Sequence, residues 1–403
     1  MSPLPDIRDA DVAGRTVLVR ADLNVPLKNG KVADATRISR FAPTIRDLLD
    51  RGASVVVMTH LGRPCGEANL VYSVQPVASV LAREIGHEVE FVPDCVGAVA
   101  ERATGHLADG KVVLLENLRF HKGEEVNSRN FALRLSVNGD IYVNDAFSCA
   151  HRAHASTHAI ATVMAAFAGP SLLAEVAALT AALETPRRPV AALVGGAKVS
   201  SKIGILKNLA TRMDHLIIGG GMANTFLAAQ GHNVGHSLHE ADCIATALDI
   251  LAIASSNKCR VLLPDDLVVA RKLAENELSE RVGIDSIPAG MMALDVGSRT
   301  VARIEAVLGK CRTLLWNGPL GAFETPPFDE ATFAVARKAA ELTEAGKLAT
   351  VAGGGDTAAA LTAAGIADRV TYLSTAGGAF LEWLEGRALP GIDILHTRSL
   401  EDA

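Results

Sequence analysis

Short, mostly apolar runs recur along the chain, and each is followed by a polar or glycine-rich segment. In the first half of the chain these runs lie at 16–19, 54–58, 89–92, 111–115 and 140–143. In the second half they lie at 190–194, 215–218, 260–263, 312–316 and 348–352. Runs of this length are typical of strands buried on both faces of a parallel sheet. Because helical stretches separate the runs, the pattern predicts an α/β fold.

One helical stretch also carries a helix-breaking residue. Residues 36–50 place one apolar stripe on a helix, made of Ile38, Phe41, Ile45, Leu48 and Leu49. Pro43 lies inside this stretch, so we expect the helix to be kinked or to begin late.

The strand pattern forms two series with a break between them. The chain has 403 residues, which is longer than one hydrophobic core usually organises. An alanine-rich helix is expected at 175–183, and Thr185-Pro186-Arg187-Arg188-Pro189 ends it. Proline- and charge-rich segments of this kind are typical of domain boundaries, so two α/β domains are expected.

Basic residues gather behind the strands of the first series. Ligands of parallel sheets bind beyond the carboxyl ends of the strands. The residues just past those ends are Asp22, Asn24, His60, Arg63, Arg119 and Arg152. Arg37 begins the helix next to the same edge. Each arginine alone would be an ordinary surface residue, and His60 alone would be structural. Four arginines at one edge of a chain with net charge −6 predict a site for a small anion.

Glycines occupy the equivalent positions of the second series. They occur in Gly195-Gly196, Gly219-Gly220-Gly221, Asn317-Gly318-Pro319 and Gly353-Gly354-Gly355-Asp356-Thr357. Lys198 and Lys202 are four residues apart, so a helix starting there would carry both on one face. Backbone N–H groups and two ammonium groups suit a polyphosphate, although an ordinary turn with two solvated lysines is the alternative. The spacing matches neither a Walker A loop nor G-x-G-x-x-G.

Asp356 has two compatible interpretations. It opens an alanine-rich stretch, where aspartate is a good N-cap. A carboxylate at a nucleotide site is also a suitable ligand for Mg²⁺. The two edges together suit a two-domain transferase that closes around a small anion and a nucleotide.

Composition narrows the classes of protein. The net charge of −6 argues against a general nucleic-acid binder. The six cysteines form no C-x-x-C pair, which argues against a zinc site or disulfide framework and favours a reducing compartment. Residues 1–14 do not resemble a signal peptide. The weakly polar run at 160–173 is interrupted by Gly169-Pro170, so no membrane span is expected.

Several motifs, in order, resemble those of the phosphoglycerate kinase family over essentially the whole chain. They begin with Arg20-Ala21-Asp22-Leu23-Asn24-Val25-Pro26-Leu27, His60-Leu61-Gly62-Arg63-Pro64, Glu116-Asn117-Leu118-Arg119-Phe120 and Ala150-His151-Arg152-Ala153-His154-Ala155-Ser156. They continue with Gly195-Gly196-Ala197-Lys198-Val199-Ser200, Trp316-Asn317-Gly318-Pro319 and Gly353-Gly354-Gly355-Asp356-Thr357.

The resemblance implies two Rossmann-like lobes, each a parallel sheet flanked by helices, joined by an interdomain helix. The expected boundaries are 1–173 for the first lobe, 174–188 for the helix and linker, and 189–379 for the second lobe. The segment 380–403 is expected to return to the first lobe. The implied reaction is reversible phosphoryl transfer between ATP and the carboxylate of 3-phosphoglycerate, giving ADP and 1,3-bisphosphoglycerate in glycolysis or gluconeogenesis. It also implies Mg²⁺ and a monomer. With the composition, we expect a cytoplasmic protein that has no nucleic-acid or membrane partner.

The resemblance also assigns roles to residues of this chain. Asp22 and Asn24 look like ligands of the glycerate group, and His60, Arg63, Arg119 and Arg152 like ligands of the 3-phosphate. Arg37 looks like a catalytic residue over the transferring phosphoryl group, and Lys198 and Lys202 like catalytic charges on the nucleotide side. Asp356 looks like the metal ligand and Glu324 like the ribose ligand. The remaining expected nucleotide contacts are Gly195, Gly219, Gly220, Asn317, Gly354, Gly355 and Thr357.

Five positions differ from the usual family pattern. Ser201 stands where aspartate is common, and Cys65 where lysine is common. Ser148-Cys149 replaces a commoner Gly-Thr, and Ala376 replaces the first glycine of a triple. Ala376 puts the backbone geometry of its turn in question, because alanine takes a positive φ less easily than glycine.

Two other functions fit part of the pattern. A dinucleotide-dependent oxidoreductase often uses doubly wound domains, but the fingerprint G-x-G-x-x-G is missing. A two-lobed anion-binding protein without catalysis explains the arginines but not the glycine edge with Asp356. Binding assays with ATP and with NAD would separate the three.

Overall fold

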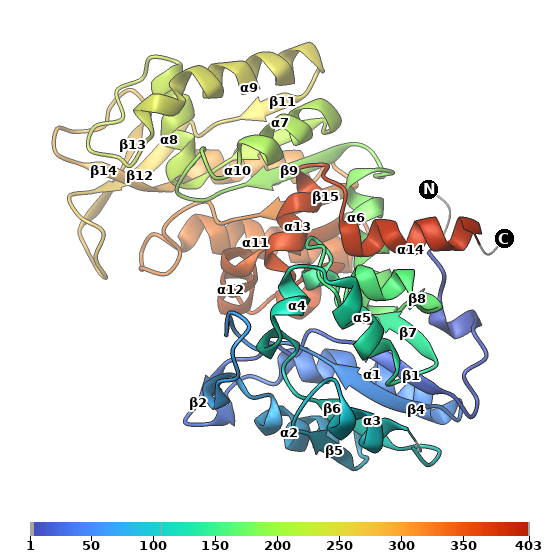
Figure 1. Ribbon diagram of the computed structural model, residues 1–403. Helices are drawn as coiled ribbons and strands as arrows, with labels where there is room; N and C mark the ends of the chain where they lie inside the picture. Colours follow the sequence, from blue (N-terminus) through green and yellow to red (C-terminus); the bar gives the residue numbers. More distant parts are fainter. Residues whose placement is uncertain (1–3, 106, 402–403) are drawn as a thin grey trace. The chain divides into compact units, whose positions relative to one another are not determined.

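The chain forms two compact units. The computed structural model describes residues 4–105 and 107–401. One unit comprises Met1–Val176 and Ala388–Ala403, and the other comprises Ala177–Arg387. In Figure 1 the first unit runs from blue to green and includes the red C-terminal helix, and the second unit runs from green to orange-red. Each unit is an α/β structure, which confirms the predicted fold class.

The first unit is built on a six-stranded sheet of order β5-β6-β4-β1-β7-β8. All its strand pairs are parallel. The strands are β1 (Thr16–Arg20), β4 (Ser54–Met58), β5 (Val89–Val92), β6 (Val112–Leu115), β7 (Ile141–Asn144) and β8 (Ala166–Ala168). Every residue of β4, β6 and β7 is buried, as the apolar runs predict. A separate two-stranded ribbon pairs β2 (Leu27–Lys28) with β3 (Lys31–Val32).

Helices cover this sheet. They are α1 (Thr36–Asp50), α2 (Gln75–Ile85), α3 (Ala98–Thr104), α4 (Lys122–Glu125) and α5 (Arg129–Ser136). In α1 the expected stripe buries all of its members except Leu49, which is half-buried. The helix begins at Thr36 and continues through the exposed Pro43, so the late start is wrong. Burial of the stripe on both sides of Pro43 offsets the lost backbone hydrogen bond.

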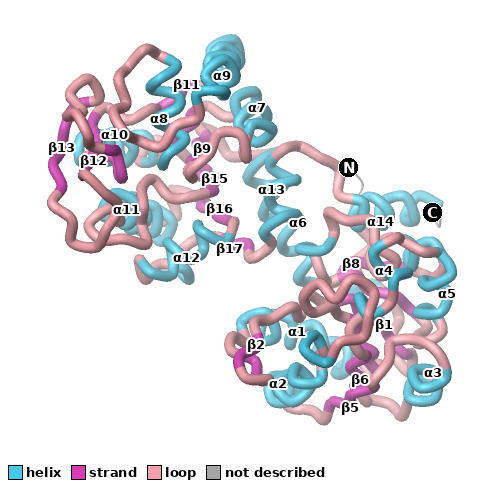
Figure 2. The backbone as a smooth tube through the Cα atoms, turned by 60° about the vertical axis from the view of Figure 1, so that its left-hand side comes forward, coloured by secondary structure: helices cyan, strands magenta, loops and turns pink. Residues whose placement is uncertain are grey.

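The second unit has its own six-stranded parallel sheet, of order β11-β10-β9-β15-β16-β17. Its strands are β9 (Val190–Val194), β10 (His215–Ile218), β11 (Arg260–Leu262), β15 (Thr313–Asn317), β16 (Ala349–Gly353) and β17 (Tyr372–Ser374). Its helices are α7 (Ile203–Arg212), α8 (Gly220–Ala229), α9 (Ile244–Ser256), α10 (Ser298–Leu308), α11 (Glu330–Glu344), α12 (Gly355–Ala363) and α13 (Gly377–Leu384). Figure 2 shows the strands of this sheet in magenta among cyan helices.

A three-stranded antiparallel sheet in the second unit has no counterpart in the sequence-based prediction. It has the order β13-β12-β14, with β12 (Asp266–Ala270), β13 (Ser279–Gly283) and β14 (Met292–Val296). The mostly exposed strand β13 has the sequence Ser-Glu-Arg-Val-Gly, which gives no apolar signal. The short edge strands β8 and β17 were also not predicted from the sequence.

The C-terminal part of the chain is divided between the units. α13 packs against α7 in the second unit. α14 (Pro390–Glu401) contacts β8 in the first unit, where Asn144 Nδ2 donates to the carbonyl oxygen of Gly391 at 3.1 Å. The division between the units falls inside α6 (Pro170–Leu183). The boundaries expected at 173, 188 and 379 remain predictions.

No helix among the described residues is both long enough and apolar enough to cross a membrane. The six cysteines are all free thiols.

Backbone contacts lock the strand-end loops of the second sheet together. The N–H group of Gly195 donates to the carbonyl oxygen of Asn317 at 3.0 Å. A Cβ atom at Gly195 would overlap the carbonyl oxygen of Pro319, and one at Gly220 would lie 2.6 Å from the carbonyl oxygen of Gly196. These glycines are therefore required because backbone segments approach each other too closely for a side chain.

We expect Gly195→Ala to lower the free energy of unfolding by about 1–3 kcal/mol, because rigid backbone must move to admit the methyl group. Gly355→Ala is the matched control, since a Cβ atom there meets nothing within 4 Å and α12 begins at this residue. Denaturant unfolding of both variants measures the difference. Equal stability of the two variants would contradict the packing argument.

Candidate functional site

Asp22 and Asn24 tie the loop after β1 to neighbouring loops. Asp22 Oδ2 accepts hydrogen bonds from Arg37 Nη1 and Ser148 Oγ. Asn24 Oδ1 accepts from the N–H group of Gly62 at 3.0 Å. The contacts bring together loops that follow β1, β4 and β7, as the parallel topology predicts.

Arg119 is held beside the same loop. Its side chain is largely buried, and Nη1 donates to the carbonyl oxygen of Gly62 at 2.8 Å. Its Nε lies 3.4 Å from Glu125 Oε1 but makes no hydrogen bond within the described residues. Burial lowers the pKa of Arg119 from its ordinary value. A guanidinium group beside other arginines at a strand-end loop is suited to an anion, because its charge and donors favour phosphate or carboxylate oxygens.

Sequence reasoning missed Arg20, the last residue of β1. Its side chain is 1% exposed, and Nε donates to Ser156 Oγ at 2.9 Å. Its Nη2 lies 3.1 Å from His60 Nδ1. Because a guanidinium cannot accept, we assign Nδ1 of His60 as the acceptor and Nε2 as the protonated nitrogen. A residue within a buried strand is normally assigned to the hydrophobic core. The only sequence signal for a functional role of Arg20 is the positive charge of its side chain.

Burial and the nearby arginines keep His60 neutral. Desolvation lowers its pKa well below the usual range, followed by the charges of Arg20, Arg119 and Arg37. Burial lowers the pKa of His154 to about 4, followed by the charges of Arg119, Arg20 and Arg152. The effects on His60 show that three guanidinium groups lie within electrostatic reach of one imidazole.

A buried carboxyl group, Glu124, offsets part of this charge. Glu124 accepts from the backbone N–H of Ser156 at 2.9 Å and from Ser156 Oγ at 2.6 Å. Burial raises its pKa, while the charge of Arg20 and the bonds from Ser156 act in the opposite direction. Ser156 therefore links the carboxylate of Glu124 to the guanidinium of Arg20.

Arg63 and Arg152 are more accessible members of this edge. Arg63 is exposed, whereas Arg152 is half-buried and donates through Nε to His151 Nε2 at 3.1 Å. The charge of Arg152 also lowers the pKa of Arg119, so the two guanidinium groups are neighbours. The structure thus groups the expected residues of the first edge in one unit.

Lys198 and Lys202 do not share a helical face, so that prediction is wrong. The helix α7 begins at Ile203, and Lys202 occupies its N-cap. A turn precedes it, in which the N–H of Lys202 donates to the carbonyl oxygen of Val199 at 2.8 Å. Ser200 Oγ donates to Glu240 Oε1 at 2.5 Å, which holds this turn outside the helix. Lys198 is consequently exposed while Lys202 folds inward.

The ammonium group of Lys202 lies beneath the glycine loop. Nζ donates to the carbonyl oxygen of Gly195 at 2.7 Å and to Asn317 Oδ1 at 2.6 Å. Burial lowers the pKa of Lys202 to about 8, and the charge of Asp356 raises it. Lys202 thus places a partly buried positive charge under the loops expected to contact a nucleotide.

The start of α12 also differs from expectation. Gly354 occupies the N-cap with a φ of 97°, and Asp356 lies in the first turn, so the N-cap interpretation of Asp356 is wrong. A side-chain cap is not needed, because glycine at the N-cap costs little. Thr357 Oγ1 donates to the carbonyl oxygen of Gly353 at 2.8 Å and accepts from the N–H of Gly318 at 2.7 Å. The carboxylate of Asp356 is left exposed beside these loops.

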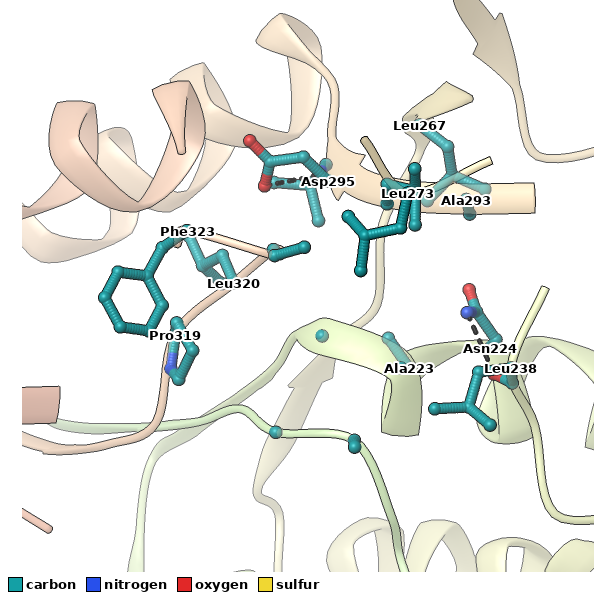
Figure 3. Close-up of a pocket in the computed structure, with 18 of the residues that line it drawn as sticks. Ala223, Asn224, Leu238, Leu267, Leu273, Ala293, Asp295, Pro319, Leu320 and Phe323 are labelled. Carbon is teal, nitrogen blue, oxygen red and sulfur yellow. Dashed lines mark hydrogen bonds between the residues drawn. The ribbon is translucent and has the colours of Figure 1, made fainter. Parts of the chain in front are cut away.

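A cavity of about 440 Å³ opens next to the glycine loops of the second unit. Its lining includes three residues expected at the nucleotide site, which are Gly220, Glu324 and Asp356. Figure 3 shows Pro319, Leu320 and Phe323 on one side of the cavity, and Asn224 and Leu238 on the opposite side. Much of the remaining wall comes from the antiparallel sheet that the sequence did not reveal.

Asp295 is a buried carboxyl group in this wall. Its oxygens accept from the N–H groups of Val296 at 2.9 Å and Ala331 at 3.0 Å. Burial raises its pKa to about 8, while the two backbone hydrogen bonds act in the opposite direction. Burial therefore disfavours a full negative charge at this part of the cavity wall.

The departures from the family pattern fit the structure in different ways. Ala376 has a φ of −89° at the N-cap of α13, so this turn does not require glycine. Ser148 donates to Asp22, and Cys149 Sγ lies 3.6 Å from Arg20 Nη2, so both contact the arginine edge. Cys65 is exposed with a φ of 58°, an uncommon conformation for a residue other than glycine.

Comparison with known proteins agrees with this geometry. A sequence model of the family described as phosphoglycerate kinase matches residues 7–387. A phosphoglycerate kinase of Methylorubrum extorquens is 53% identical over 399 residues, covering 98% of this chain and 100% of the relative. That of Agrobacterium fabrum is 55% identical over 387 residues, covering 96% of this chain and 97% of the relative.

Solved structures give the same result. The structure of phosphoglycerate kinase from Coxiella burnetii matches with a TM-score of 0.92 and 40% identity, covering 98% of this chain and 100% of that one. The enzyme from Pyrococcus horikoshii OT3 matches with a TM-score of 0.83 and 30% identity, covering 99% and 100%. These matches confirm the resemblance seen in the motifs, and the chain belongs to the phosphoglycerate kinase family.

Proposed function

We propose that the chain transfers a phosphoryl group reversibly between ATP and the carboxylate of 3-phosphoglycerate, a step of glycolysis and gluconeogenesis. Family membership and the names of its relatives support this activity. The main structural support for this activity is that the two units have different kinds of candidate binding site. One unit concentrates arginines at its strand ends, and the other has a cavity of about 440 Å³ beside glycine loops.

The first unit supplies the acceptor site in this proposal. Asp22 and Asn24 bind the glycerate group, and the 3-phosphate is held by His60, Arg63, Arg119 and Arg152. The charge of Arg119 and the neutral imidazole of His60 support this assignment, since guanidinium and imidazole N–H groups can donate to phosphate oxygens.

The second unit supplies the nucleotide site. The ribose contacts Glu324, which lines the cavity. The phosphates lie near Lys198 and Lys202, together with Gly195, Gly219, Gly220, Asn317, Gly354, Gly355 and Thr357. The positive charge of Lys202 and the backbone N–H groups at the starts of α8 and α12 support this placement.

Mg²⁺ fits the same site. The exposed carboxylate of Asp356 lines the cavity, and hard carboxylate oxygens are preferred Mg²⁺ ligands. When bound with the nucleotide, the ion neutralises negative charge on the phosphates.

The proposal also includes a monomer in the cytoplasm, and sedimentation of the purified chain tests the oligomeric state.

Phosphoryl transfer needs alignment and neutralised charge more than covalent help. The acceptor is an ionised carboxylate, so no general base is required. We expect the units to close around both substrates, which excludes water and protects ATP from hydrolysis. Closure would bring Arg37 of the first unit and Lys202 of the second to the transferring phosphoryl group.

The alternative is a two-lobed anion-binding protein without catalysis. It leaves the cavity and the glycine loops of the second unit unexplained. A coupled assay for ATP-dependent phosphorylation of 3-phosphoglycerate separates the two functions. Tight binding of both ligands without turnover would favour the alternative.

Arg152→Ala should weaken binding of 3-phosphoglycerate about 10–100-fold, because it removes charge-assisted hydrogen bonds to the phosphate. ATP affinity should stay unchanged, since Arg152 belongs to the other unit. Arg129→Ala, an exposed arginine of the same unit, is the control. Titration calorimetry with each ligand measures both affinities. Equal losses for the two ligands would overturn the assignment.

Arg37→Ala should lower the turnover number on the order of 10³-fold, by analogy with arginine fingers. Binary affinities for 3-phosphoglycerate and ATP should change only a few-fold, because the charge acts mainly in the transition state. Lys202→Ala should lower turnover and also weaken ATP. A double-mutant cycle on turnover should be non-additive, since both charges act on one group. Loss of 3-phosphoglycerate affinity in proportion to rate would make Arg37 an acceptor ligand instead.

Asp356→Asn should raise the Mg²⁺ concentration needed for half-maximal activity on the order of 10-fold, a loss typical of disturbed metal ligation. An amide is a weaker ligand for this ion than a carboxylate. Asp368→Asn, another exposed aspartate of the second unit, controls for lost surface charge. Steady-state rates over a range of Mg²⁺ concentrations provide the measurement. Unchanged Mg²⁺ dependence would remove Asp356 from the metal site.

A further inference from the structure

Asn224 places a fixed hydrogen-bond acceptor at one end of the cavity. It lies on α8, its side chain is 2% exposed, and it lines the cavity. Its Nδ2 donates to the backbone carbonyl oxygen of Leu238 at 3.1 Å. A carbonyl oxygen can only accept, so the nitrogen of the amide must face Leu238. The orientation of this amide is therefore determined by its partner.

The opposite atom of the amide consequently faces the cavity. Figure 3 shows the nitrogen of Asn224 turned to Leu238 and the oxygen turned away from it, toward the interior. Oδ1 accepts no hydrogen bond from the described part of the chain, and it is not among the fully enclosed polar atoms. The oxygen is thus an accessible acceptor in the cavity lining, where a donor on a ligand can take the place of water.

The surroundings of Asn224 suit the base of a nucleotide. Leu238, Leu267, Leu273 and Ala293 provide apolar wall beside it. Pro319, whose carbonyl oxygen abuts Gly195 of the glycine loop, lies on the opposite side of the cavity in Figure 3. A nucleotide with its phosphates at the glycine loops would thus direct its base toward Asn224.

We propose that Asn224 determines base specificity, with Oδ1 accepting a hydrogen bond from an exocyclic amino group such as N6 of adenine. This inference rests on the proposed function, because it concerns the base of the same nucleotide. A base with a carbonyl oxygen at this position, as in hypoxanthine or guanine, places two acceptors against each other. The donor on Asn224 cannot turn to compensate, because Leu238 holds it.

The test compares ATP with ITP, which carries a carbonyl oxygen in place of the amino group. The chain should use ATP about 10-fold better in kcat/KM, the size expected from one neutral hydrogen bond. Asn224→Leu should bring the ATP-to-ITP ratio close to 1, mainly by weakening ATP. Asn208→Leu is the matched control, since Asn208 also donates to a backbone carbonyl oxygen but lies outside the cavity lining. That variant should keep the ratio of the unchanged chain.

Purine riboside triphosphate, which has only hydrogen at this position, separates the two contributions. Its kcat/KM should lie between those of ATP and ITP if Oδ1 both accepts a hydrogen bond from an amino group and repels a carbonyl oxygen. Asn224→Ala provides a second variant if the leucine disturbs folding, which circular dichroism would reveal. Equal use of ATP and ITP by the unchanged chain, or a ratio that survives in both variants, overturns the proposal.

Binding distinguishes this proposal from the proposed function. If the chain turns over no nucleotide, the assignment of the reaction fails. Titration calorimetry with ADP and IDP then still decides the role of Asn224. A preference for ADP that disappears in Asn224→Ala supports the specificity role without catalysis, and equal affinities overturn it.

Discussion

The buried guanidinium of Arg20 is the charge on which the arginine edge of the first unit depends. An unpaired charge at 1% exposure would cost several kcal/mol. Arg20 instead donates to Ser156, which also donates to the carboxylate of Glu124. The same guanidinium fixes Nδ1 of His60 as an acceptor. Loops that follow three different strands are thereby held in place before any ligand arrives.

Lys202 has a comparable position in the second unit, but its surroundings differ. Its ammonium group is held by oxygens of Gly195 and Asn317 rather than by a carboxylate. Burial without a close counterion lowers its pKa to about 8. The site therefore holds positive charge that is incompletely neutralised by the protein, and an anionic ligand stabilises its protonated form. Glu124 offsets part of the positive charge at the arginine edge, whereas no carboxylate among the described residues forms an ion pair with Lys202.

The sequence predicted the two parallel sheets because long buried strands produce uninterrupted apolar runs. Those runs also located Asp22, His60 and Arg119, since parallel strands end at one edge. Other features depend on contacts that have no local signal. The turn before α7 is set by Glu240, forty residues away, so the shared face of Lys198 and Lys202 could not be tested from their spacing. Asn224 looks like an ordinary helix residue until its bond to Leu238 is known.

The antiparallel sheet is the clearest case of a functional element that local pattern reasoning missed. Its central strand β12 is fully buried, yet β13 carries mostly exposed polar residues and β14 is only partly buried. This arrangement leaves the face near Asp295 and Ala293 available to the cavity. A strand that borders a ligand cavity need not complete its apolar pattern with protein, because the ligand covers part of its surface. Incomplete apolar patterning in β14 therefore agrees with its place in the cavity wall, which we propose as the nucleotide site. Strands that are buried by protein on both faces have complete apolar runs, so the sequence revealed those strands instead.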